Sequence, residues 1–155
     1  MLNQGDPVPD VTLQMADGSL VKLSTLNRPL VVYFYPKDDT PGCTTEAKDF
    51  SALKAAFDMA GVGLLGVSKD PPTKHAKFSA KYDLTFPLAT DADGNVTEGF
   101  GTWIEKSLYG RKYMGIDRAT FLIGKDGRIA RAWHKVKVKG HAEEVLAAAR
   151  ALAEA

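Results

Sequence analysis

Cysteine is almost missing from this chain of 155 residues, which contains only Cys43. A single cysteine excludes a disulfide within the chain, a CxxC redox pair and a zinc site built from several cysteines. An excess of charge is missing too, because 20 Lys and Arg face 19 Asp and Glu and leave a net charge of +1. This balance argues against both nucleic acid and an acidic membrane as partners.

Long apolar runs are absent as well. The best candidate, residues 30–35, is far shorter than the roughly 18 residues that a membrane span needs. The first residues have neither the basic region nor the apolar region of a secretory signal. We therefore expect a cytoplasmic protein in a reducing compartment, where a lone cysteine stays a thiol unless its chemistry is used.

The rest of the composition is that of one globular domain. Hydrophobic residues make up 45% of the chain and charged residues 25%, which is ordinary usage for a protein with a packed core. No repeat or linker-like segment divides the sequence, so we expect a single domain over residues 1–155.

The pattern of apolar residues predicts an α/β fold. Residues 11–15 and 19–23 flank Asp17-Gly18, which predicts an N-terminal β-hairpin. The run 30–35 is typical of a strand buried on both faces, and residues 44–60 have the spacing of a helix. The order of elements resembles the thioredoxin fold, with a central mixed β-sheet flanked by helices. Further strands are expected over 62–67, 117–123 and 128–134, and further helices over 73–82 and 141–155.

Cys43 lies where the first buried strand gives way to the first long helix. Reactive groups in α/β sheets favour the carboxyl ends of strands, and the free N–H groups of a helix start favour a thiolate over a thiol. The competing interpretation is a small buried hydrophobe, the commonest role of a free cysteine. The small and polar neighbours of Cys43 leave the two interpretations about evenly balanced.

Three other residues are candidates for the same site. Thr40, three residues before Cys43, can bring its hydroxyl beside the sulfur through a turn, although an ordinary turn threonine is the commoner case. Arg118 leads into a buried strand, where a guanidinium needs a partner, and Glu46 is a candidate for that partner. A surface arginine at a strand end is the alternative.

These residues carry a resemblance to the peroxiredoxin family. Pro36, Thr40 and Cys43 fit its Pro-x-x-x-Thr-x-x-Cys pattern, and the likeness covers most of the chain. Within the family, the sequence is similar to the PrxQ branch, also called bacterioferritin comigratory protein. The segments that carry this second likeness are 5–10, 44–47, 106–110 and 118–123.

The resemblance implies a thiol peroxidase with no cofactor and no metal. Cys43 would be the peroxidatic cysteine, Thr40 its hydroxyl partner, and Arg118 the cation that holds thiolate and peroxide. Pro36 would shape and shield the pocket, to which Gly42 and Glu46 also belong. The substrate would be hydrogen peroxide, with alkyl hydroperoxides as further candidates, and Cys43 would pass through a sulfenic acid.

The chain departs from the family pattern in its second thiol. Many PrxQ proteins have a resolving cysteine five residues after the peroxidatic one, where this chain has Lys48, and others have it on the next helix, here 73–82. An external thiol reductant would therefore close the cycle: thioredoxin, glutaredoxin with glutathione, or another small thiol. A Cys43–Cys43 disulfide between two chains is a further alternative. The expected assembly is a monomer or a weak homodimer. The alternatives are a peroxide sensor or redox relay that forms a mixed disulfide with a partner through Cys43, and a binding module with an inert Cys43.

Overall fold

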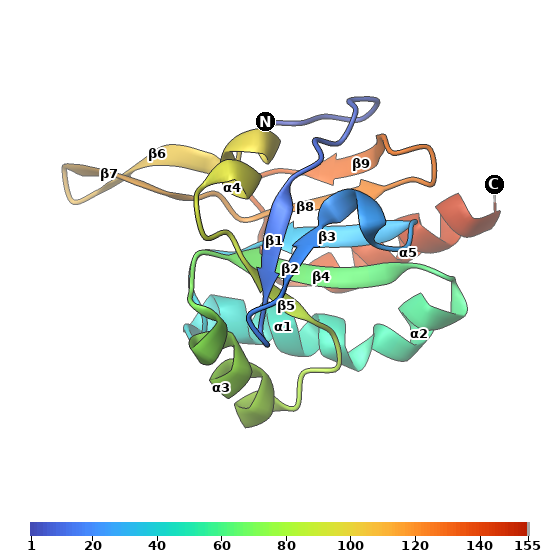
Figure 1. Ribbon diagram of the computed structural model, residues 1–155, viewed down its shortest axis with the longest axis horizontal. Coiled ribbons are helices and arrows are strands. Elements are labelled where there is room, and N and C mark those ends of the chain that lie inside the picture. The colour runs from blue at the N-terminus through green and yellow to red at the C-terminus, as the bar shows by residue number, and fades with distance from the viewer. Residues whose placement is uncertain (155) are drawn as a thin grey trace.

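The computed structural model describes residues 1–154, and its core is a mixed seven-stranded sheet in the order β2-β1-β5-β4-β3-β8-β9 (Figure 1). β3, β4 and β5 run parallel, whereas β8 is antiparallel to β3. The strands are β1 (Thr12–Met15), β2 (Leu20–Lys22), β3 (Leu30–Phe34), β4 (Gly63–Ser68), β5 (Leu88–Thr90), β6 (Trp103–Leu108), β7 (Arg111–Ile116), β8 (Ala119–Ile123) and β9 (Ile129–Trp133). The helices are α1 (Pro41–Ala52), α2 (Lys54–Met59), α3 (Pro72–Tyr82), α4 (Asn95–Phe100) and α5 (His141–Glu154), with a 3-10 turn at Leu23–Thr25.

Both faces of the sheet are covered, and β3 and β8 are therefore buried along their whole length. Side chains of α1, α2, α3 and α5 pack on one face, around Tyr33, Phe50 and Phe57. The other face packs against α4 and the N-terminal segment, around Phe34, Phe100 and Phe121. Period-two alternation along β3 sends Tyr33 to one face and Phe34 to the other, as expected for a central strand.

The loops that follow β3 and β4 lie at the same end of the sheet because the two strands are parallel. The β6–β7 hairpin projects from the body at that end, on the left of Figure 1. Arg118 comes directly after this hairpin and before β8, the antiparallel neighbour of β3. The topology therefore brings Arg118 toward the first turn of α1, where Cys43 lies.

The expected α/β architecture is confirmed, including the central mixed sheet with flanking helices and the N-terminal hairpin of β1 and β2. The helix expected over 44–60 is instead two helices, because the backbone bends at Leu53. Phe50 and Phe57, one on each side of the bend, are both fully buried in the same cluster, so the apolar face that the spacing predicts is kept. The first of these helices also begins earlier, at Pro41, a residue that suits a first turn.

Residues 88–116 contain four elements that the sequence pattern does not predict. β5 has only three residues and α4 only six, which is too short for a clear period. The strands of the β6–β7 hairpin are largely exposed and carry charges on both faces, so they have no apolar stripe to reveal them. The predicted C-terminal helix is present as α5, and its expected last residue, 155, lies outside the described residues.

Candidate active site

Cys43 is the third residue of α1, and its side chain is buried, with 2% of the residue exposed. Thr40 is the N-cap, and its carbonyl accepts the first helical hydrogen bond from the Thr44 N–H at 2.8 Å. The first N–H groups of a helix have no partner within the helix and carry a positive partial charge. The sulfur therefore lies in the one turn of α1 that favours a negative charge.

Arg118 reaches this sulfur from across the sheet. Its Nη2 donates to Cys43 Sγ at 3.3 Å, and its Nη1 donates to Glu46 Oε1 at 2.7 Å. A Cβ added to Gly42 would lie 3.2 Å from Nη2, so the missing side chain at Gly42 gives the guanidinium room to approach. The close approach of Cys43, Glu46 and Arg118 is a property of the fold, since 72 and 75 residues separate the partners in sequence.

Electrostatics in this cluster depend on burial. Burial raises the pKa of the Glu46 carboxyl to about 7, although the Arg118 guanidinium beside it works in the opposite direction. Burial opposes the charge of Arg118, but Glu46 and Cys43 outweigh it and hold the pKa of Arg118 above its ordinary value. Within residues 1–154, Glu46 Oε2 is buried and has no hydrogen-bond partner. Arg118 therefore stays positively charged beside the sulfur, whereas Glu46 loses its negative charge when it binds a proton.

The Thr40 hydroxyl does not make the hydrogen bond to the sulfur that its place in the sequence allowed. The Thr40 hydroxyl donates to the Lys37 carbonyl at 2.8 Å, so its one proton is engaged in closing the loop rather than directed at Cys43. Its lone pairs remain available to accept a hydrogen bond. Pro36 follows the end of the buried strand and is exposed.

Two buried residues near this site escape sequence reasoning. Tyr33 of β3 is 1% exposed, and burial, reinforced by Glu46 and Cys43, raises the pKa of its phenol well above the ordinary value. Burial lowers the pKa of His141 to about 4, and its Nε2 lies 2.8 Å from Thr120 Oγ1. A lone histidine without a partner at metal-ligand spacing has no signal in the sequence, so nothing in the chain's pattern points to His141.

A surface hollow of about 560 Å³ borders the first turn of α1. Its walls come from the beginnings of α1 and α5 and include Gly42, Thr45, Lys139 and Glu143. Gly42, which precedes Cys43 directly, lines this hollow, whereas the Cys43 side chain is buried. In the part of the chain that the structure describes, no helix has the length and apolar character needed to cross a membrane.

Known proteins of similar sequence show the family of this chain. Residues 4–132 match the AhpC/TSA family. The chain is 47% identical over 146 residues to the peroxiredoxin Bcp of Xanthomonas campestris pv. campestris, which covers 94% of this chain and 91% of that protein. It is 44% identical over 151 residues to the peroxiredoxin Bcp of Bacillus subtilis, covering 97% and 96%.

Solved structures extend the likeness to three dimensions. The peroxiredoxin Q of Xanthomonas campestris superposes with a TM-score of 0.89 at 45% identity, covering 99% of this chain and 98% of that one. The peroxidoxin BcpB of Mycobacterium tuberculosis superposes with a TM-score of 0.86 at 34% identity, covering 98% and 99%.

The fold and these relatives define a class, the thiol-dependent peroxidases built on a thioredoxin-like sheet. The chain belongs to the AhpC/TSA family and, within it, to the peroxiredoxin Bcp or PrxQ branch. Its single cysteine makes it a one-cysteine member of that branch.

Proposed function

We propose that Cys43 is the peroxidatic nucleophile of this enzyme, with Arg118 as the catalytic cation. The observation that carries the proposal is the 3.3 Å contact between Arg118 Nη2 and Cys43 Sγ in the first turn of α1. A nearby positive charge and free helix N–H groups favour the thiolate, which is the nucleophilic form of cysteine. The same donors can follow negative charge as it moves onto the peroxide oxygens, which stabilises the transition state more than the ground state.

The reaction transfers one oxygen to sulfur. The thiolate of Cys43 attacks one peroxide oxygen, the O–O bond breaks with its electron pair, and the departing oxygen takes a proton to leave as water or an alcohol. The sulfur is oxidised to a sulfenic acid as the peroxide is reduced. The Thr40 hydroxyl, whose own proton is donated to Lys37, accepts the hydrogen bond of the peroxide O–H and so aligns the substrate.

Hydrogen peroxide and alkyl hydroperoxides are the proposed substrates. A structural study of the Xanthomonas campestris bacterioferritin comigratory protein concerns its alkyl peroxide reduction activity, and that protein is 45% identical to this chain. The hollow beside Gly42 has room for the organic part of such a substrate. Gly42 and Glu46 act on the pocket through Arg118, the first by leaving space and the second by binding Nη1. Pro36, exposed at the mouth of the loop, is proposed to limit access of water.

An external thiol must return Cys43 to its reduced state, because the chain has no second cysteine. A thiol attacks the sulfenic sulfur, releases water and forms a mixed disulfide, and a second thiol then displaces Cys43 as thiolate. Thioredoxin, or glutaredoxin with glutathione, are the proposed donors. We place this cycle in the cytoplasm, with a monomer or a weak homodimer as the working form.

The test is one peroxide equivalent followed by intact-mass measurement, with Cys43→Ser as control. The expected result is one added oxygen in the wild type within seconds and none in the variant. An unmodified wild-type protein under excess peroxide would overturn the proposal. A turnover assay then compares the candidate donors. Fast oxidation combined with no turnover by any of them would favour the peroxide sensor or redox relay instead.

A further inference from the structure

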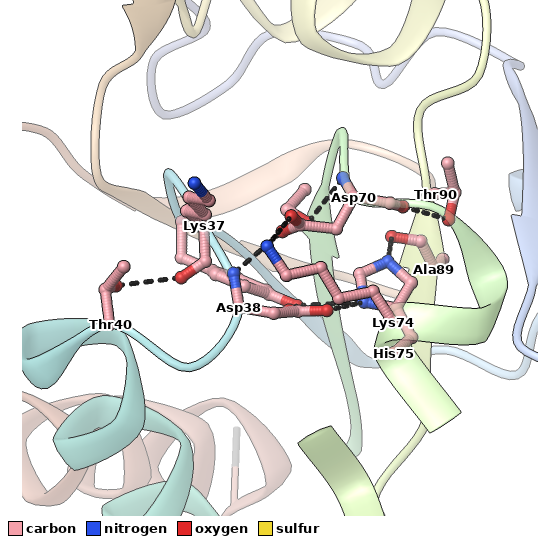
Figure 2. A network of polar contacts seen from close by, with 10 residues as sticks. Lys37, Asp38, Thr40, Asp70, Lys74, His75, Ala89 and Thr90 are labelled. Carbon is pink, nitrogen blue, oxygen red and sulfur yellow. Dashed lines mark hydrogen bonds and ion pairs between the residues drawn. The ribbon is translucent and has the colours of Figure 1, made fainter. Parts of the chain in front are cut away.

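The loop before α1 contains a buried carboxylate that the peroxidase chemistry does not use. Asp38 is 2% exposed, although it lies in a polar loop at the surface end of the sheet. Its Oδ2 lies 2.6 Å from Nδ1 of His75 on α3, and its Oδ1 accepts a hydrogen bond from the Tyr35 hydroxyl. His75 itself is 0% exposed. Figure 2 shows its ring against the Asp38 carboxylate. A residue of the loop between β3 and α1 is thus held in place by a hydrogen bond from α3.

The geometry fixes how many protons this pair holds. Nε2 of His75 lies 3.1 Å from the Ala89 carbonyl, which can only accept, so Nε2 carries a hydrogen. A second proton must lie between Nδ1 and Asp38 Oδ2, because two lone pairs do not approach to 2.6 Å. Whether that proton is bound to the ring or to the carboxylate, Asp38 and His75 together have no net charge, and both ring nitrogens make hydrogen bonds. Such a pair fixes direction as well as distance.

The backbone of the same residue is held as firmly as its side chain. The Asp38 N–H donates to Asp70 Oδ2 at 2.7 Å, in the connection between β4 and α3. Asp70 also accepts from the Ser68 hydroxyl at 2.7 Å and pairs with Lys74 Nζ at 3.2 Å, as Figure 2 shows for Asp70 and Lys74. The loop is therefore attached at Asp38 by two independent groups of α3 and its leading turn.

The following residues carry this attachment to the start of α1. Asp39, with φ of 59°, accepts from Lys81 Nζ at 2.9 Å and from the Tyr82 hydroxyl at 2.8 Å, both at the end of α3. Thr40 then closes the loop on the Lys37 carbonyl and caps α1. Contacts with α3 thus fix the position at which α1 begins. Arg118 belongs to a different part of the sheet, next to β8.

We propose that His75 is a positioning residue for Cys43: acting through Asp38, it fixes the start of α1 so that Sγ stays buried and within reach of Arg118. This inference rests on the proposed peroxidase role of Cys43. Apolar side chains of similar size often replace buried ionic pairs without loss of stability, so folding alone does not require this pair. What an apolar side chain cannot supply is the directed link from α3 to the loop.

The test compares His75→Leu and His75→Asn with the wild type in two reactions of Cys43. The first is the second-order reaction with hydrogen peroxide across pH, and the second is alkylation by iodoacetamide. For His75→Leu we expect the peroxide rate to fall about 10- to 100-fold, as for a reacting group displaced by about 1 Å. Its pH midpoint should rise. Alkylation measured at a pH above that midpoint, where the thiol is fully ionised, should become faster because the displaced loop exposes the sulfur. His75→Asn places an amide N–H near the position of Nδ1 and should restore most of the peroxide rate.

Ile129→Ala is the matched control, since it opens a cavity in the hydrophobic cluster on the other face of the sheet. It should lower the unfolding temperature and leave both Cys43 reactions unchanged. A folded His75→Leu with wild-type rates and pH midpoint would overturn the inference. If His75→Leu does not fold, Asp38→Ala decides, because a methyl side chain makes no hydrogen bond to Nδ1 of His75 and so removes the link from the other end; wild-type rates there would equally overturn the inference. A wild-type protein whose Cys43 does not react with hydrogen peroxide would refute the proposed function instead.

Discussion

Replacing Arg118 with methionine removes the cation beside the sulfur while keeping a side chain of similar length. The Nη2–Sγ distance is 3.3 Å, and opposite unit charges about 4 Å apart interact by roughly 4 kcal/mol at an effective dielectric constant near 20. Glu46, 2.7 Å from Nη1, cancels part of that field, so we take about 2 kcal/mol as the net loss. This corresponds to about 1.5 pH units in the midpoint of the peroxide reaction and about 30-fold in its rate.

The same substitution has a pH-dependent effect on stability. Arg118 lowers the pKa of Glu46, so in Arg118→Met that pKa rises further above about 7 and the carboxyl stays protonated in the folded state at neutral pH. The unfolded carboxyl ionises near its ordinary pKa, so the folded variant binds the extra proton and its stability falls as pH rises. We therefore expect the unfolding temperature of Arg118→Met to lie close to that of the wild type at pH 6 and clearly below it at pH 8.5.

Rapid mixing with peroxide, quenching and intact-mass detection of the added oxygen measures the rate at each pH. Arg131→Met is the control, since Arg131 also binds a glutamate, Glu144 at 3.1 Å, but in a pair that is about half exposed. Exposed pairs contribute little, so this variant should react like the wild type. Rates for Arg118→Met within twofold of the wild type over the whole pH range would refute the role given to the cation.

Three further predictions concern the same site. Gly42→Ala places a Cβ 3.2 Å from Arg118 Nη2, so the peroxide reaction should slow severalfold, and an unchanged rate would contradict the crowding argument. The unfolding temperature of this variant should stay the same or rise, because alanine favours a helix over glycine by roughly 1 kcal/mol. The pKa of His141 is about 4 when folded, so its contribution to stability is lost as pH falls from about 6.5 to 4, whereas Glu46, with a pKa of about 7, opposes this by losing stability as pH rises from about 4.5 to 7. His141→Gln should therefore leave only the falling trend in thermal unfolding between pH 4.5 and 7, and a curve identical to the wild type would count against it. Because Cys43 has no resolving cysteine in the chain, a peroxide dose series without reductant should drive it to sulfinic acid at lower doses than a two-cysteine relative, and equal resistance would argue for protection by the buried site.

Local sequence signals predicted the elements that carry the site but not the distances between their side chains. The apolar run of β3 and the small, polar residues before Cys43 indicated a buried strand that leads into a helix start. The candidate pairing of Arg118 with Glu46 was also stated from sequence, and the structure places their side chains in contact. The distance of Arg118 from the sulfur depends on the antiparallel pairing of β8 with β3, which is a long-range contact without a local signature.

Other features in and around the site could not be predicted from local sequence. Thr40 gives its proton to Lys37, a choice set by the loop conformation rather than by the spacing to Cys43. His75 was one of three scattered histidines with no metal-ligand spacing, and only the packing of α3 against the loop shows that it binds Asp38. The β6–β7 hairpin escaped prediction because its strands present no buried face.

The sequence by itself determined the number of thiols, because no arrangement of one cysteine closes a disulfide within the chain, and the proposal of an outside reductant rests on that number. It also determined that Cys43 stands between a buried strand and a helix, since both have local periodic patterns. Only the tertiary structure decided what surrounds the sulfur. Arg118, Glu46 and the Asp38–His75 pair are joined by sheet pairing and helix packing between distant segments, and such contacts arise from the whole core rather than from any one stretch of chain.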